Sequence, residues 1–133
     1  MAKFRNACRQ SIQSDLRKVK LSYFREHSIK GRVKCQESNE LLKWEELNID
    51  HRQPNTFSVI VERFVEKNSI TLESIEYNEI DGGQDELADI KLKELFILFH
   101  KEKANLRLIN QGLNLGRSHQ SRINRQKKDL VIE

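Results

Sequence analysis

Cysteine is scarce in this sequence, and long apolar runs and a recognisable secretory leader are lacking. The two cysteines, Cys8 and Cys35, are too few for the disulfide framework of a small secreted protein. The longest apolar run, Leu95 to Phe99, falls far short of the roughly 20 residues that cross a membrane. Residues 1–20 are polar and basic and contain no apolar stretch of the kind found in signal peptides. These absences predict a cytoplasmic protein that does not enter a membrane.

Enough apolar residues remain for one folded domain, and the charge is unevenly distributed. Hydrophobic residues make up 37% of the 133 positions, and they include six Phe, two Tyr and one Trp. This content predicts a real core rather than a disordered chain. Residues 62–94 hold ten acidic and four basic side chains and so carry a charge of −6. Since the net charge of the whole chain is +4, the remaining residues carry +10. A basic body favours a polyanion such as nucleic acid, although solvated helix faces are the simpler alternative.

Hydrophobic periodicity predicts helices joined by short strands. Between residues 5 and 26, apolar side chains recur at steps of three or four, as on the buried face of an amphipathic helix. A second helix follows a cap at Asn55 or Thr56. A third is predicted over residues 85–103, with a buried face of Leu87, Ile90, Leu95, Leu98 and Phe99. Strands are predicted over residues 32–35, 41–44, 47–50, 72–80 and 106–109, and a further helix over residues 113–122.

Two distant segments carry the residues with the clearest chemical meaning. Asp50 and His51 follow the predicted strand 47–50. Far downstream, Asn105 opens a short strand, Asn114 comes nine positions later at a helix start, and Arg117 follows three positions after that. Together these residues resemble the HNH endonucleases of the ββα-metal nuclease superfamily. In that family a strand ending in Asp-His, a strand opening with Asn-Leu and a helix beginning at Asn-x-x-Lys or Asn-x-x-Arg form one metal-dependent site.

The resemblance implies an α+β fold with a ββα-metal (HNH) core. Residues 47–50 would pair antiparallel with residues 106–109, and the helix near Asn114 would follow. The whole chain, residues 1–133, is interpreted as a single nuclease domain with an added N-terminal helix. Its motif core covers residues 32–57 and 104–122, a helical insert covers residues 58–103, and a basic tail covers residues 123–133.

The residue types suit the hydrolysis of a phosphodiester, which needs a base, a positive charge on the phosphate and help for the leaving oxygen. His51 is the candidate general base, because imidazole titrates near neutral pH. Asp50 and Asn114 offer the hard oxygen ligands that Mg²⁺ prefers, and Mn²⁺ is the alternative ion. The resemblance assigns these same roles. It also makes Asn105 the residue that orients His51, and Arg117 the residue that holds the phosphate or the leaving group.

The implied substrate is DNA, with RNA as an alternative. Because one site cuts one strand, a double-strand break would require a homodimer or a second event. The candidate nucleic-acid contacts are four arginines of the two motif segments, namely Arg52, Arg107, Arg117 and Arg122.

The sequence departs from the family at the zinc-binding cysteine pairs that many members carry. The first pair would fall on Cys35 and Ser38, and the second on Asn110 and Leu113. One thiolate of four cannot make a tetrahedral zinc site, so no structural zinc is expected. We expect Cys35 instead to be a small core residue.

Simpler interpretations exist for each candidate residue. His51 alone is compatible with a surface histidine in a turn, and Asn105 with a helix C-cap. The other histidines, among them His100, have the context of structural or solvent-exposed residues. For the whole chain, the rivals to an enzyme are a catalytically inactive HNH scaffold that binds nucleic acid and a regulatory protein that acts through the acidic insert. In a strand, moreover, neighbours such as Asp50 and His51 point to opposite faces unless the strand ends or twists there.

Overall fold

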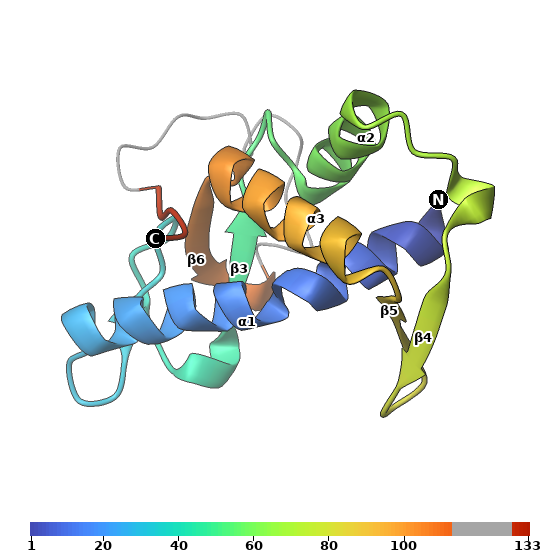
Figure 1. Cartoon of the computed structure of the whole chain (residues 1–133). Helices are drawn as coiled ribbons and strands as arrows, with labels where there is room; N and C mark the ends of the chain where they lie inside the picture. The colour runs from blue at the N-terminus through green and yellow to red at the C-terminus, as the bar shows by residue number, and fades with distance from the viewer. Residues whose placement is uncertain (113–128) are drawn as a thin grey trace.

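The computed structural model describes residues 1–112 and 129–133 of the chain, which form an α+β structure (Figure 1). Three helices dominate the described part: α1 (Ala2–His27), α2 (Phe57–Lys67) and α3 (Ile90–Lys103). Six short strands form three two-stranded antiparallel sheets. The pairs are β1 (Val33–Lys34) with β2 (Leu41–Leu42), β3 (Leu47–His51) with β6 (Leu106–Asn110), and β4 (Tyr77–Ile80) with β5 (Gln84–Leu87). Two single turns of 3-10 helix are η1 (Trp44–Glu46) and η2 (Leu72–Ser74).

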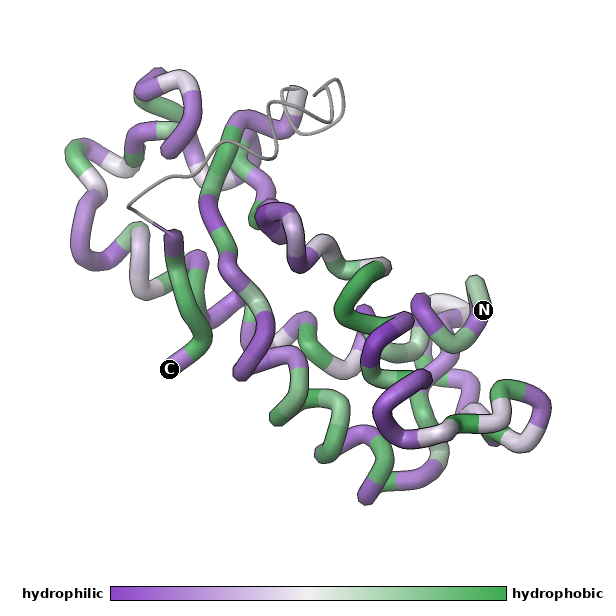
Figure 2. Tube along the Cα trace, turned by 90° about the horizontal axis from the view of Figure 1, so that it is seen from above, coloured by the Kyte–Doolittle hydropathy of each residue, from purple (hydrophilic) through white to green (hydrophobic). Residues whose placement is uncertain are grey.

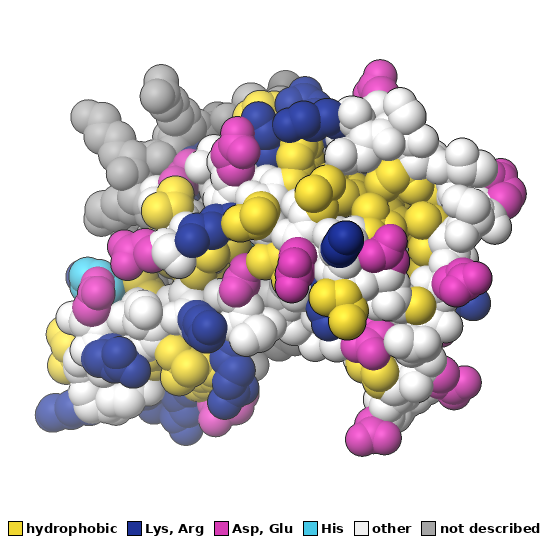
Figure 3. Space-filling view, viewed as in Figure 1, with side chains coloured by type: hydrophobic (Ala, Val, Ile, Leu, Met, Phe, Trp, Pro, Cys, Tyr) yellow, Lys and Arg dark blue, Asp and Glu magenta, His cyan; other side chains and the backbone are white. Residues whose placement is uncertain are grey.

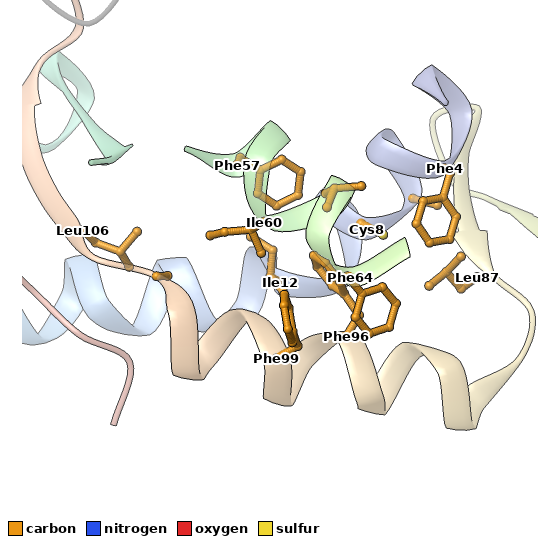
Figure 4. Packing of buried hydrophobic residues seen from close by; sticks show 13 residues of the cluster. Phe4, Cys8, Ile12, Phe57, Ile60, Phe64, Leu87, Phe96, Phe99 and Leu106 are labelled. Atoms are coloured by element: carbon orange, nitrogen blue, oxygen red, sulfur yellow. The ribbon is translucent and has the colours of Figure 1, made fainter. Parts of the chain in front are cut away.

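The main hydrophobic core lies where the three helices meet (Figure 4). The apolar positions predicted on the first half of α1 are buried, and Phe4, Cys8 and Ile12 all point into this core. Aromatic rings of α2 and α3 fill its centre, where Phe64 lies edge-to-face with Phe96 at 5.1 Å between ring centroids. Such pairs stabilise a core beyond the area that they bury, so the aromatic cluster fixes how α2 sits on α3.

The pairing of β3 with β6 joins two segments that lie far apart in the sequence. Its register places Leu47 opposite Asn110 and His51 opposite Leu106. The predicted antiparallel pairing of residues 47–50 with 106–109 is therefore confirmed. A second core cluster lies against this pair, and its buried members are Val33, Cys35, Leu42, Leu47, Leu108 and Ile109.

The insert between β3 and β6 is only partly helical. Residues 85–87 were predicted to begin a helix, but they belong to β5, which pairs with β4 around a turn at Gly82 and Gly83. Both glycines have positive φ, a conformation that other residues rarely adopt. The helix begins later, where Asp89 accepts hydrogen bonds from the amides of Lys91 and Leu92. The description of residues 58–103 as a helical insert is therefore corrected to two helices and a hairpin.

The two ends of the chain lie on opposite sides of the structure in both ribbon views (Figures 1 and 2). The end of the predicted basic tail lies against β6, since the amide of Leu106 donates to the carbonyl of Leu130 at 2.8 Å.

In the part of the chain that the structure describes, no helix combines the length and apolarity needed to cross a membrane.

Candidate functional site

The site predicted from the sequence lies where β3 ends and β6 begins. Beyond the last ladder pair, the amide of Arg52 donates to the carbonyl of Asn105 at 2.8 Å. This bond extends the β3–β6 pairing by one step, so the Asp50-His51 end of one strand adjoins the Asn105 start of the other. Two of the three motif segments are thus adjacent in space, although 53 residues separate His51 from Asn105 in the sequence.

His51 is buried and bonded to another histidine. Its Nε2 lies 2.8 Å from Nε2 of His100, which comes from the last turn of α3. The ring of Phe57, at the start of α2, lies 5.3 Å from the ring of His51. His51 is only 8% exposed, so it is not the surface histidine of the simpler interpretation.

Both imidazoles are neutral at pH 7. Burial, and after it the positive charges that His100 and Arg9 would place nearby, lower the pKa of His51 to about 3. Burial also lowers the pKa of His100, to about 4. A neutral imidazole has one N–H donor and one acceptor nitrogen, so one Nε2 of the pair donates to the other.

The surroundings of His100 decide which nitrogen carries the proton in the resting pair. Nδ1 of His100 is buried, and no described group forms a hydrogen bond with it. An unpaired buried N–H is costly, so the proton of His100 is favoured on Nε2, where it donates to His51. His51 then carries its own proton on Nδ1. A base at Nδ1 requires the opposite arrangement, in which His51 donates from Nε2 and His100 accepts.

Asp50 engages different partners from His51, as expected for neighbours on a strand. It lies opposite Arg107 in the β3–β6 ladder, and its Oδ2 accepts from Nε of Arg107 at 3.3 Å. Glu37 lies 3.9 Å from the same guanidinium group. Asp50 is 4% exposed and Arg107 is fully buried. A buried guanidinium group flanked by two carboxylates therefore occupies one side of β3.

Two arginines predicted to contact nucleic acid lie inside the protein. Arg107 is held by the ion pairs just described, and Nη1 of Arg52 donates to Asp129 at 2.7 Å. Arg52 is only 2% exposed. Because a backbone phosphate must be reached from the surface, we correct both residues from nucleic-acid contacts to internal ion-pair partners. The bond to Asp129 also ties residues 129–133 to the end of β3.

Asn105 contributes through its backbone. Its carbonyl accepts from Arg52, whereas its exposed side chain forms no hydrogen bond within residues 1–112 and 129–133. Because any residue type can accept this backbone bond, the bond does not test the predicted role of Asn105 in orienting His51. The alternative role as helix C-cap belongs to Ala104, the residue before it.

Cys35 is a buried core residue, as predicted, and its sulfur accepts hydrogen bonds from two backbone amides. The backbone amides of Ser38 and Asn110 donate to Sγ at 3.3 and 3.2 Å. Burial raises the pKa of the thiol, but the hydrogen bonds at Ser38, Glu37 and Asn110 outweigh it, so the pKa lies below its ordinary value. The sulfur of Cys35 is therefore in contact with the backbone of Ser38 and of Asn110. These same three positions are the ones that align with the zinc-binding cysteines of many HNH proteins.

The remaining candidates, Asn114, Arg117 and Arg122, lie outside the described residues. Within residues 1–112 and 129–133, no three His, Cys, Asp or Glu side chains gather as the ligands of a metal ion would.

Sequence reasoning missed two residues near His51, namely His100 and Arg9. His100 lies four positions after Phe96, which places both on one helix face, and this spacing was the available signal. Arg9 lies on α1 with its guanidinium carbon 4.4 Å from the ring centroid of Phe57. It belongs to no motif segment, so no sequence signal linked it to His51.

Comparisons of the chain with protein-family models, with curated proteins and with solved structures found no match.

Proposed function

We propose that this protein is a metal-dependent DNA endonuclease of the HNH type, which hydrolyses a phosphodiester with His51 as general base. The pairing of β3 with β6 carries the proposal. The motif predicted that the strand ending in Asp50-His51 pairs antiparallel with the strand that follows Asn105. These two strands, β3 and β6, are paired antiparallel in the structure. A motif that arose by chance would carry no information about which distant strands are neighbours.

The surroundings of Cys35 support the same alignment independently. The amides of Ser38 and Asn110 both reach its sulfur, where family members with zinc would hold the metal with cysteines. Hydrogen bonds from these amides satisfy the sulfur here.

In the proposed reaction, His51 takes a proton from the attacking water at Nδ1 while its Nε2–H donates to His100. The burial that keeps His51 neutral also makes it a weak base, with a pKa of about 3 in the free protein. A bound phosphate brings negative charge close to the imidazole and raises its pKa toward the working range. Substrate binding therefore prepares the base for its task.

The donor set of the proposed site suits Mg²⁺ or Mn²⁺. Asp50 and Asn114 would hold the ion through a carboxylate and an amide oxygen, both hard ligands. Arg107 donates to Oδ2 of Asp50, so a bound ion would share this carboxylate with the guanidinium group. When bound, the ion would supply positive charge at the phosphate and lower the pKa of a coordinated water.

Incubation with supercoiled plasmid tests the proposal. We expect nicked or linear products with Mg²⁺ or Mn²⁺, and none with EDTA. Ends that DNA ligase reseals without further treatment would show a 5′-phosphate and a 3′-hydroxyl, the products that the family implies. Cleavage in EDTA, or no cleavage of plasmid or oligonucleotides with either metal, would contradict the proposal.

A catalytically inactive scaffold that binds nucleic acid is the second candidate, and the resting tautomer favours it. When His100 donates to His51, neither nitrogen of His51 offers a free lone pair. Nitrogen NMR of the ¹⁵N-labelled histidines, with DNA bound, separates the two candidates. A nuclease requires an unprotonated Nδ1 on His51 in the complex, whereas a protonated Nδ1 there fits the inactive scaffold.

A further inference from the structure

Two arginines of α1 lack the carboxylate partners that the buried arginines have. Arg5 and Arg9 are four positions apart, so they lie on one face of the helix. Neither takes part in an ion pair with any described residue. Nε of Arg5 is buried and has no hydrogen-bond partner in the described part of the chain. By contrast, Arg52 and Arg107 are each matched by a carboxylate.

Arg9 lies close to the histidine pair. Its guanidinium carbon lies 4.4 Å from the ring centroid of Phe57, and that ring lies 5.3 Å from His51 and 6.1 Å from His100. Packing on an aromatic ring uses the flat face of a guanidinium group and leaves N–H donors at its edge. The ring of Phe57 thus contacts both Arg9 and His51, and the side chain of Arg9 stays exposed to solvent.

The charges around Arg9 favour an incoming anion. Partial desolvation by the residues packed around it, and then the positive charge of Arg5, lowers the pKa of Arg9. Asp85 of β5 lines the same surface depression as Arg9, but no ion pair joins the two within the described residues. Two neighbouring cations without a paired carboxylate repel each other, and an anion between them relieves that repulsion.

We propose that Arg9, supported by Arg5, binds a backbone phosphate of the nucleic acid and holds it beside His51. The inference rests on the proposed nuclease function and gives α1, which lies outside the motif, a part in the site. A guanidinium group matches a phosphate with two parallel hydrogen bonds, so Arg9 combines charge with orientation.

Figure 3 shows how charge is distributed along α1. Lys and Arg side chains gather at the lower left, over the C-terminal half of α1 and over η1, and acidic side chains gather at the lower right over the hairpin of β4 and β5. Along α1, Arg5, Arg9 and Arg17 recur at intervals of four and eight residues. Because α-helices rise 1.5 Å per residue, these residues span about 18 Å, which is enough to follow several phosphates of one strand.

The test measures binding and cleavage of one duplex oligonucleotide by the full-length protein. The variants are Arg9→Gln, Arg9→Lys and, as control, Arg63→Gln, an exposed arginine of α2 in the acidic part of the chain. Binding is titrated in EDTA at several salt concentrations, and cleavage is followed with Mg²⁺. Thermal melting checks the fold of each variant.

We expect Arg9→Gln to weaken binding about tenfold, as the loss of one charge-assisted hydrogen-bonded contact does. The slope of log affinity against log salt should fall by about 0.9, the value for one phosphate contact. Arg9→Lys should keep the salt slope but still lose affinity, because a lysine cannot form the paired bonds. Arg63→Gln should stay within twofold of the wild type.

Each outcome separates this inference from the nuclease proposal. If Arg9→Gln binds and cuts like Arg63→Gln, the role of Arg9 is overturned and the nuclease stands. If Arg9→Gln loses affinity while the wild type binds but does not cut, the phosphate contact stands and the nuclease falls. A wild type that neither binds nor cuts removes both. If Arg9→Gln fails to fold, Arg9→Lys decides, since wild-type affinity in that variant overturns the paired contact.

Discussion

The buried pair of His51 and His100 couples the stability of the fold to pH. Both pKa values are far below the value of about 6.5 that histidine has in an unfolded chain. The folded state therefore excludes protons that the unfolded state binds. The contribution of the pair to stability is complete above pH 6.5 and is lost as the pH falls from there toward the folded values. The facing groups from α2 and α3 are apolar rings, and the charged neighbour from α1 is Arg9.

The first prediction is a loss of stability between pH 7 and pH 5. Each buried histidine should lower the free energy of unfolding by about 2 kcal/mol over this range, since the unfolded chain gains a proton there. His100→Gln should therefore show a smaller decrease than the wild type, by about 2 kcal/mol. Urea unfolding at both pH values measures the difference.

His27→Gln serves as control, because His27 is an exposed residue at the end of α1. It should keep the full pH dependence. An equal decrease for the wild type and His100→Gln would contradict neutral burial of the pair.

The second prediction concerns the buried ion pair of Asp50 and Arg107. Arg107→Leu should destabilise the protein by about 3–5 kcal/mol, because it leaves the carboxylate of Asp50 buried without its partner. Adding Asp50→Asn should recover part of that loss, since the double variant no longer buries the charge of Asp50 without Arg107. Denaturant unfolding of both variants provides the readout. A double variant less stable than Arg107→Leu would show that the pair is not the dominant interaction of Asp50.

Among the elements, α2 offers a matched test of local capping. The side chain of Thr56 accepts from the amide of Val59, as the sequence predicted for a cap at Asn55 or Thr56. Thr56→Ala should cost about 1 kcal/mol of stability. Thr71 stands at the corresponding position before η2, but its side chain makes no capping bond. Thr71→Ala should therefore change the melting temperature very little, and equal effects of the two substitutions would contradict the capping account.

The buried face of α3 shows where prediction from periodicity fails. Ile90, Leu95 and Leu98 were expected in the core, but they are 70%, 48% and 65% exposed. Apolar residues occur on several faces of this helix, so the spacing alone does not select one. Packing against α2 selects the face of Phe96, Phe99 and His100.

The β3–β6 pair was predictable, whereas the histidine pair was not. Short strands carry little pairing information of their own, and the motif supplied it through Asp50-His51 and Asn105. His100 was interpreted as structural or solvent-exposed from its place in a predicted helix, and its partner His51 lies 49 residues away in the sequence. The burial of Arg52 and Arg107 could not be predicted from the sequence either, because the carboxylates that pair with them come from distant segments.

At the scale of the whole molecule, positive and negative charge lie in different places. The hairpin of β4 and β5 carries acidic side chains, and α1 carries basic ones (Figure 3). A strand of nucleic acid that runs from Arg9 toward Arg17 leads away from the hairpin, so the acidic side chains of the hairpin tip should not be needed for cleavage. Glu79→Gln combined with Asp81→Asn should therefore change cleavage by less than twofold at about 0.15 M salt, where the screening length is about 8 Å. A large loss of cleavage would instead assign the hairpin an essential role.

The central claim is that His51 acts on the phosphodiester, and a direct comparison of cleavage rates tests it. The initial rate of plasmid nicking with Mg²⁺ is measured for the wild type, His51→Ala and His27→Ala, at protein concentrations that give equal DNA occupancy. We expect His51→Ala to bind DNA but to lose at least about a hundredfold in rate, the lower range for general-base catalysis, and His27→Ala to match the wild type. A folded His51→Ala variant that nicks DNA as fast as the wild type would contradict the account.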